Sequence, residues 1–328
     1  MKLKNNIVSL LTVLPLSLFA QFDGIVWTTG CKAIHCDDLR ILEWATGCTV
    51  TRGYQNIALP ANGYASYGTD NDAIGKVQED LATTKAVSLG DSGIAILTFH
   101  TPIVNGEGYD FAVFENSFSD DYLELAFVEV SSDSIHYYRF PATSNTPIDK
   151  QTGPYASTDA TLINNLAGKY RVGWGTPFDL EELLPADEGL DINNIRYVKV
   201  IDVVGSIKSE YATYDVNGNA VNDPYPTNFA SGGFDLTGVA VMNNQTNVGI
   251  ADFPEWIVSA YPNPCRDFIL IRAEVCRMSL YSIAGQKLQE DQTTDNLYRL
   301  DMSSYPAGIY MLHLQSNRSK KTVRIIKQ

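Results

Sequence analysis

The chain of 328 residues lacks the motifs that identify common hydrolases and nucleotide-binding enzymes. It contains no Gly-x-Ser-x-Gly, no Walker loop and no His-Glu-x-x-His. Ala33-Ile34-His35-Cys36 and Gly90-Asp91-Ser92-Gly93 echo the histidine and serine boxes of trypsin-like proteases, but Ser92 follows His35 too closely for a barrel to form between them. Turn chemistry alone explains the second segment. The absence of a catalytic constellation favours binding over catalysis.

Basic residues are scarce: 24 Lys and Arg face 38 Asp and Glu, and the net charge is −14. The first 20 residues and residues 252–328 each carry +2, which leaves −18 for residues 21–251. Such a region repels nucleic acid and anionic lipid, and no basic patch with interleaved aromatics offsets it. The acidity suits divalent cations, although it also simply keeps a secreted protein soluble.

Cysteine is scarce too, with five in the chain. In an exported protein they indicate oxidised pairs with one thiol left over. The expected pairs are Cys265 with Cys276, which flank the run from Phe268, and two of Cys31, Cys36 and Cys48. A zinc site at Cys31, His35, Cys36 and Cys48 fails on spacing, because no Cys-x2–4-Cys pair faces a second one.

Long apolar runs are limited to the N-terminus. Lys2 and Lys4 precede the apolar stretch from Ile7 to Phe19, and Ala20 precedes an expected cut ahead of Gln21. This pattern predicts a secretory signal peptide over residues 1–20. No other segment approaches the roughly 18 apolar residues of a membrane span. Because no Cys follows the cut, lipid anchoring is unsupported.

The C-terminal segment contains short runs of β-branched and aromatic residues between turn signals, which predicts a small β-sandwich. The runs are Phe268–Arg272, Met278–Ile283, Tyr298–Asp301, Ile309–Leu314 and Thr322–Ile326. In the run from Ile309, the alternation places Tyr310, Leu312 and Leu314 on one face.

This segment resembles a known family through motifs that occur in order. They are Tyr261-Pro262-Asn263-Pro264, residues 280–285 (Leu-Tyr-Ser-Ile-Ala-Gly), residues 300–310 and a basic last strand. The pattern is similar to the type A C-terminal sorting domain of the type IX secretion system in Bacteroidetes. That resemblance implies export across the outer membrane, removal of the domain by a sortase, and attachment of the remainder to surface lipopolysaccharide. The alternative is an ordinary Ig-like domain kept for binding.

The central region reads as successive strands separated by Gly, Asn, Asp and Pro clusters. The predicted strands are Val87–Leu89, Ile94–Phe99, Phe111–Glu115, Ala126–Ser131, Tyr137–Pro141, Tyr197–Val204 and Leu236–Met242. Helices are expected at Asp37–Trp44 and Asp159–Leu166. The excursion Gly205–Gly233 is long enough to be functional or ordered by a ligand. A jelly-roll-like antiparallel sandwich fits best, within an all-β chain.

The predicted organisation is therefore a signal peptide (1–20), a jelly-roll-like surface domain (21–245), a linker (246–256) and a sorting domain (257–328). Blocks of the surface domain resemble an uncharacterised family of secreted or cell-surface β-sandwich proteins. They are Val87–Asp91, Asp110–Asn116, Ala126–Asp133, Leu166–Tyr170, Gly175–Leu180, Ile201–Gly205 and Ser231–Leu236. This resemblance supplies fold and location but no reaction.

Several carboxylates fall on apolar strand faces. Period-two alternation places Asp202 with Val198 and Val200, Glu129 with Phe127, and Glu115 with Phe111 and Val113. Asp235 lies at the start of the last strand. Because an unpaired buried carboxylate is costly, each needs a cation, a hydrogen-bonding partner or an altered pKa. We expect a calcium site formed by Glu115, Glu129, Asp202 and Asp235. The alternative is that Arg139, Lys199 or Arg196 and backbone amides satisfy them.

Aromatic residues gather in two glycine-rich loop segments. They are Tyr170, Trp174, Phe178, Tyr214, Tyr225 and Phe229. Such rings stack on the faces of sugars, or simply pin long loops to the sandwich.

The sequence thus predicts an exported cell-surface protein, most simply a non-catalytic module that binds a glycan or small nutrient and holds a structural calcium. The expected partners are the type IX secretion machinery and a sortase, with no nucleic acid. One alternative is a glycosidase-like hydrolase using two of Glu115, Glu124, Glu129, Asp179 and Asp202 as acid and base. Another is a structural or adhesive coat protein.

Overall fold

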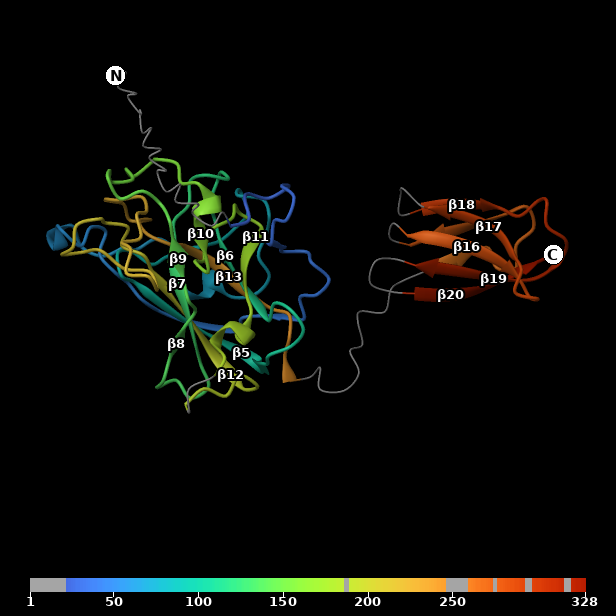
Figure 1. Ribbon diagram of the computed structural model, residues 1–328, viewed down its shortest axis with the longest axis horizontal. Helices are drawn as coiled ribbons and strands as arrows, with labels where there is room; N and C mark the ends of the chain where they lie inside the picture. The colour runs from blue at the N-terminus through green and yellow to red at the C-terminus, as the bar shows by residue number, and fades with distance from the viewer. Residues whose placement is uncertain (1–21, 186–188, 246–258, 274–275, 293–296, 316–319) are drawn as a thin grey trace, which may run out of the picture. The chain divides into compact units, whose positions relative to one another are not determined.

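The computed structural model describes residues 22–185, 189–245, 259–273, 276–292, 297–315 and 320–328. The expected signal peptide, its cut at Gln21 and the linker lie outside these residues. The chain divides into two compact units, residues 1–250 and 251–328 (Figure 1). None of the helices in the described ranges is long and apolar enough to cross a membrane.

The first unit is built on two antiparallel sheets (Figure 1). One contains β1 (Ile34–His35), β11 (Trp174–Phe178), β6 (Phe111–Glu115), β13 (Asp235–Val241) and β2 (Glu43–Trp44) in that order, with β4 (Val87–Ser88) also paired to β13. The other contains β3 (Gly47–Thr51), β5 (Ile94–Ile103), β12 (Ile195–Asp202), β7 (Ala126–Ser131) and β8 (Tyr138–Arg139). A small ribbon pairs β9 (Thr143–Ser144) with β10 (Ile163–Asn164).

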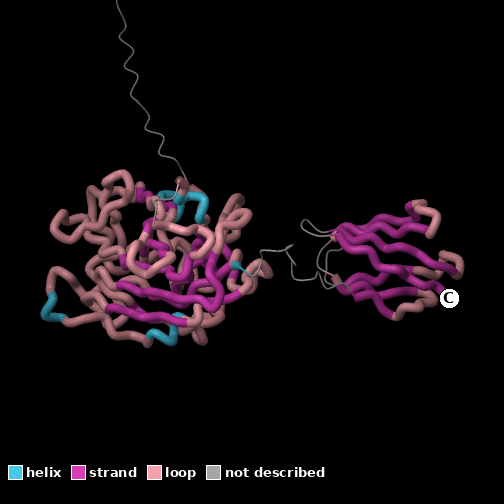
Figure 2. Tube along the Cα trace, turned by 90° about the horizontal axis from the view of Figure 1, so that it is seen from below, coloured by secondary structure: helices cyan, strands magenta, loops and turns pink. Residues whose placement is uncertain are grey.

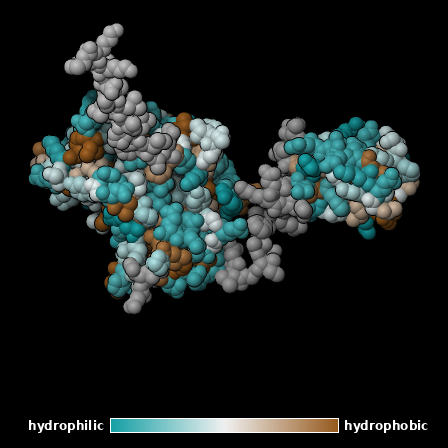
Figure 3. Space-filling model, in the orientation of Figure 1, coloured by the Kyte–Doolittle hydropathy of each residue, from teal (hydrophilic) through white to brown (hydrophobic). Residues whose placement is uncertain are grey.

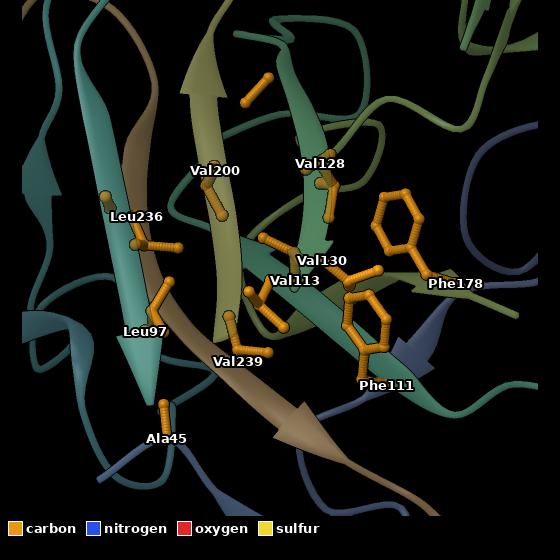
Figure 4. Packing of buried hydrophobic residues seen from close by; sticks show 14 of the residues in the cluster. Ala45, Leu97, Phe111, Val113, Val128, Val130, Phe178, Val200, Leu236 and Val239 are labelled. Carbon is orange, nitrogen blue, oxygen red and sulfur yellow. The ribbon is translucent and has the colours of Figure 1, made fainter. Parts of the chain in front are cut away.

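The core of this unit lies between the two sheets. Figure 4 shows Phe111, Val113 and Val239 from the first sheet facing Val130 and Val200 from the second. The long strands alternate between the sheets along the chain, β5, β7 and β12 in one and β6, β11 and β13 in the other. This alternation is the jelly-roll arrangement that the strand pattern predicts, and the all-β fold is confirmed.

In the part of the chain that the structure describes, helix is confined to short 3-10 turns, η1 (Pro60–Asn62), η2 (Asp70–Ala73), η3 (Ala160–Leu162) and η4 (Leu180–Leu183). The predicted helix Asp37–Trp44 is wrong. The Asp38 side chain accepts a hydrogen bond from the Arg40 amide at 2.9 Å, which forms a turn, and Trp44 pairs with Ala240 of β13. Local turn chemistry and sheet pairing therefore outweigh the helical pattern. The predicted helix Asp159–Leu166 shrinks to η3, capped by Asp159.

The long excursion from Gly205 to Gly233 packs against the sandwich, and much of it is buried. Amide side chains hold it in place. Asn222 Nδ2 donates to the carbonyls of Pro147 and Lys150 at 2.7 and 2.8 Å, and Gln151 Nε2 donates to the Gly205 carbonyl at 2.9 Å. Figure 2 shows how much irregular chain of this kind surrounds the strands of the first unit. These hydrogen bonds fix the position of the excursion, and with it the position of Asp223.

The second unit is a small sandwich of two sheets. One holds β14 (Ser259–Tyr261), β15 (Phe268–Arg272) and β18 (Leu297–Asp301), and the other holds β17 (Lys287–Gln292), β16 (Arg277–Ser282), β19 (Gly308–Gln315) and β20 (Lys320–Lys327). Tyr310, Leu312 and Leu314 are buried together, so the predicted alternation in β19 is confirmed.

Candidate functional site

Three carboxylates meet inside the first unit. Glu115, Glu124 and Asp235 each place an oxygen within 4.8 Å of the others. The residues are 1%, 7% and 7% exposed, respectively. Carboxylates at this distance repel each other strongly in a medium of low dielectric, so this carboxylate cluster is the most unusual electrostatic feature of the fold.

The strand register places two of these residues side by side. Glu115 ends β6, and its register partner is Leu236 of β13, directly after Asp235. Ser88 of β4 is the register partner of Asp235, and its hydroxyl donates a hydrogen bond to that carboxylate. The strand that carries Asp235 is therefore paired on both sides, with β4 and with β6.

The third residue, Glu124, lies in the loop between β6 and β7. The Ser117 hydroxyl donates to the Ser119 carbonyl at 2.8 Å and contacts the Tyr122 carbonyl, which folds this loop back. Gly168 supports it from the other side, with a φ of 85°, and a Cβ there would lie 1.8 Å from the Glu124 carbonyl oxygen. Only glycine fits this approach.

One carboxylate oxygen of the cluster is buried without a hydrogen-bond donor among the described residues. Glu115 Oε2 accepts from the Ser117 amide at 2.6 Å, but Oε1 has no hydrogen-bond partner among the described residues. Buried carboxylate oxygens are almost always paired, because an unmade hydrogen bond there costs about 1–3 kcal/mol or more. A bound proton or a cation would therefore stabilise this oxygen.

Three further acids lie around the cluster. Asp223 Oδ2 accepts from the Leu125 amide at 3.0 Å, while its buried Oδ1 also lacks a partner in the described chain. Asp202 accepts from the amides of Phe234 and Ser92 at 2.7 and 3.0 Å. Asp91 accepts from the Ile57 amide at 2.7 Å.

The pKa of each of the six carboxyl groups is raised, and burial is the main cause. Burial, followed by the charge of Asp235, raises the pKa of Glu115 and Glu124 well above the usual range for Glu. Burial also raises the pKa of Asp202 and Asp223 well above the usual range for Asp. It raises the pKa of Asp235 to about 6 and that of Asp91 to about 7.

Among the described residues, no basic side chain forms an ion pair with the cluster. The nearest candidate is Arg52, whose charge lowers the pKa of Asp235, but its guanidinium donates to the carbonyls of Tyr67 and Gly68 at 2.7 Å and to that of Ser88. None of the ion pairs in the described ranges includes any of the six acids. The cluster can therefore hold shared protons or a divalent cation.

The structure brings together only part of the predicted metal set. Glu115 and Asp235 join the cluster, and Asp202 lies beside it but is occupied by backbone amides. Glu129 is elsewhere: it binds Arg139 at 2.8 Å and Lys199 at 2.9 Å. Val128 and Val130 take the inner face of β7, so Glu129 is on the outer face, opposite Lys199 of β12. The pairing alternative holds for this residue.

The predicted metal set did not include Glu124 of the cluster or Asp223 beside it. Both lie in loops, where no strand period assigns a face, and the fold joins them from distant parts of the chain. The only available signal was the excess of acids in this region.

The six predicted ligand-binding aromatics do not converge, and three of them are held inside the fold. Phe178 stacks on Phe111 in the core with ring centroids 5.3 Å apart. The Tyr170 hydroxyl bonds the buried Asp23, and that of Tyr225 donates to Asn56 at 3.1 Å. The other three are more open and separately placed: Trp174 packs edge-on against Trp27, Phe229 faces Tyr155, and Tyr214 is exposed.

A second group of possible metal ligands, His35, Cys36 and Asp37, is already engaged. His35 binds Glu79 through Nε2 at 3.3 Å and accepts the Asp37 amide at Nδ1, and Asp37 pairs with Lys76 at 2.5 Å. Cys31, Cys36 and Cys48 are free thiols in the structure, and Cys265 forms no disulfide with Cys276, so neither expected pair is present.

Comparison with known proteins identifies the second unit. Residues 259–328 match the secretion system C-terminal sorting domain. No curated protein matches the chain. The segment thus carries the signal for export through the type IX secretion system, and the protein is secreted to the cell surface.

Solved structures give weak likenesses. PorZ, a surface component of the type IX secretion system of Porphyromonas gingivalis, is 15% identical over 28% of this chain and 14% of its own, with a TM-score of 0.21. The β-glucuronidases of Ruminococcus gnavus and Lactobacillus rhamnosus are 11% identical over 87% and 88% of this chain, with TM-scores of 0.21. The chain spans 42% and 44% of those enzymes. Similarity at this level carries no inference about activity.

Proposed function

We propose that this exported protein is a non-catalytic cell-surface module whose sandwich is completed by a buried calcium ion and whose surface binds a glycan or small nutrient. Glu115, Glu124 and Asp235 hold the ion, with Asp223 as a fourth ligand. The observation that carries the proposal is the unpartnered Glu115 Oε1 inside a cluster of buried acids.

The spacing of the cluster suits calcium. Calcium binds oxygens at 2.3–2.6 Å, so two ligands on opposite sides of it lie about 4.8 Å apart. The three clustered oxygens fall within that separation. Magnesium binds at about 2.1 Å, demands a regular octahedron and sheds its water reluctantly. The three clustered carboxylates come from two strands and a loop, and Asp223 offers an unpartnered oxygen from a second loop outside that group. Calcium accepts an irregular, poorly hydrated site of this kind.

A cation also resolves the electrostatic conflict. Without it, several carboxyls must bind protons at neutral pH to remain buried, because ionised acids without partners are very costly inside a protein. With a divalent cation, two charges are neutralised and the orphan oxygens of Glu115 and Asp223 gain a ligand bond. The ion would tie the long excursion, through Asp223, to the strands that carry Glu115 and Asp235.

The burial of the cluster speaks against the hydrolase alternative. A glycosidase needs its two carboxyl groups on either side of a bound substrate, but Glu115 is 1% exposed. Asp179, another candidate acid, caps η4 by accepting from the Glu181 amide at 3.0 Å.

We propose that the sorting unit engages the secretion machinery and a sortase, while the first unit is the part displayed.

Thermal unfolding of the purified chain tests the calcium ion. After prolonged incubation with a chelator, calcium should raise the melting temperature of the first unit, and magnesium should do so less effectively. At a hundredfold excess over the dissociation constant, the expected gain is about 2.7 kcal/mol. Glu115→Gln should reduce this gain, because the amide keeps the shape but loses the charge.

Glu129→Gln is the matched control. It removes a carboxylate that lies on a strand of the same unit and binds Arg139 and Lys199 near the surface. The calcium response should survive this change. If neither the chelator nor calcium changed the melting temperature, we would conclude that shared protons, and not a cation, stabilise the cluster.

A further inference from the structure

A hollow lies on the outer face of the five-stranded sheet, away from the core. Its volume is about 430 Å³, within the range of small-molecule sites. The side chains that line it include Thr49, Ile96, Thr98, Ser134, Tyr137 and Tyr197. None of these was singled out by the aromatic or acidic patterns of the sequence.

The floor of the hollow follows from strand register. Gly47 of β3 lies opposite Thr98 of β5, which lies opposite Tyr197 of β12. In the next row, Thr49 lies opposite Ile96. Gly47 has no side chain to project into the hollow from the first row. A Cβ at this position would lie 2.5 Å from Thr98 Oγ1. The result is a level floor with one apolar side chain among hydroxyl groups.

One wall is an aromatic ring held in place. The Lys199 ammonium lies 3.4 Å from the centre of the Tyr137 ring and binds Glu129 at 2.9 Å. Glu129 also binds Arg139. The ring is therefore immobilised by a cation–π contact, and Glu129 offsets one of the two positive charges beside it.

The rim is also preorganised. Ser134 has a φ of 67°, an uncommon conformation for a residue other than glycine. The carboxylate of Asp133 holds this turn by accepting from the amides of Ile135 and His136 at 2.8 and 2.9 Å. Local strain maintained by its surroundings is frequent at ligand sites.

The chemistry of the lining defines the ligand class. The residues that line the hollow carry no charge, which disfavours an ionic ligand. Tyrosine rings and Ile96 offer flat apolar contact, and threonine, serine and tyrosine hydroxyls offer both donors and acceptors. A neutral sugar ring combines one apolar face with a rim of hydroxyls, so it matches both features. The volume admits one or two sugar units.

We propose that this hollow is the binding site for a neutral saccharide. The proposal deepens the ligand-binding part of the function proposed above and is independent of the calcium ion. Here Tyr137 and Tyr197 supply the stacking surfaces, and Thr49, Thr98 and Ser134 supply hydrogen bonds.

Calorimetric titration of the purified chain tests it. The probes are neutral hexasaccharides of glucose, mannose, xylose and galactose, with hexagalacturonate as the charged comparison. At least one neutral probe should bind, and more tightly than the charged one. Tyr197→Ala and Tyr137→Ala should each weaken binding by tenfold or more, since stacked rings dominate such sites. Thr49→Trp should abolish binding by filling the hollow.

Tyr214→Ala and Trp27→Ala are the controls, because both rings are exposed and neither lines the hollow. They should leave binding unchanged. None of the variants should alter the calcium response, so failure of the saccharide site is distinguishable from failure of the ion site. Absence of binding by every neutral probe at millimolar concentration overturns the proposal, as does binding that the hollow variants do not affect.

Discussion

Residues of one chemical type have opposite roles in this protein, and their neighbours decide which. Glu129 has Arg139 and Lys199 within reach and is an ordinary ion pair on the outer face of β7. Glu115, in the interior, accepts from the Ser117 amide through one oxygen, and its other oxygen has no hydrogen-bond partner among the described residues. The same contrast separates Asp202, held by two amides, from Asp223, which has one bonded and one unbonded oxygen.

Asp110 lets the effect of burial be measured away from the proposed ligands. It accepts from the amides of Gly106 and Leu180, both at 2.8 Å, and from Asn243. Burial nevertheless raises its pKa from 3.8 to about 6. The folded chain therefore binds more protons than the unfolded chain between about pH 4 and 6, so the contribution of Asp110 to stability is present at low pH and is lost as pH rises through 6.

We expect this loss to be roughly 2–3 kcal/mol across that interval. Asp110→Asn should lower stability overall but remove this part of the pH dependence. Denaturant unfolding at fixed calcium from pH 4 to 7, compared between the two chains, checks this. Parallel stability curves for the two chains would contradict the assignment.

At the scale of elements, the proposed calcium site combines ligands from two strands with ligands from two loops. β6 and β13 present Glu115 and Asp235, while the β6–β7 loop adds Glu124 and the long excursion adds Asp223. The loops are fixed by close backbone approaches, of which the one at Gly168 is the tightest near the cluster.

Gly168→Ala should therefore displace the segment that carries Glu124. Gly218→Ala is the matched control, since Gly218 also has a positive φ, 80°, but a Cβ there would meet nothing within 4 Å. The control should cost about 1 kcal/mol through backbone conformation alone. Gly168→Ala should cost about 2 kcal/mol more and should also reduce the calcium-induced rise in melting temperature. Equal costs would show that the approach at Gly168 does not hold Glu124.

The sequence pattern was sufficient to predict the strands, but it predicted only some of the residues of the candidate site. Phe111–Glu115 and Ala126–Ser131 match β6 and β7 because buried strands are short β-branched and aromatic runs bounded by turns. Period two also placed Glu129 correctly beside Phe127, but could not say that this face was the outer one. Glu124 and Asp223 depend on how loops pack, which no local pattern encodes.

At the scale of the whole molecule, export and function belong to separate units. The second unit has its own core, including Ile269, Leu300 and Leu312. It contains the secretion system C-terminal sorting domain over residues 259–328. The first unit contains both the carboxylate cluster and the hollow, and the face of it seen in Figure 3 is mostly hydrophilic with separate hydrophobic spots. Such a surface suits a protein exposed to the medium.

Deleting the chain from Tyr261 onward should therefore abolish surface delivery and leave the protein in the periplasm. Fractionation and surface labelling of cells that express the truncated and intact chains measure this. The truncated first unit should still show the calcium response, which separates misfolding from missorting. Surface display of the truncated chain would contradict the role of the second unit.

The central claim is that the carboxylate cluster binds one calcium ion. Calorimetric titration of the chelator-treated chain with calcium at neutral pH tests it most directly. We predict saturable binding with a stoichiometry of one ion per chain, weakened at least tenfold by Asp223→Asn and unchanged by Glu129→Gln. A flat titration, or a single site that survives Asp223→Asn with full affinity, would contradict the account.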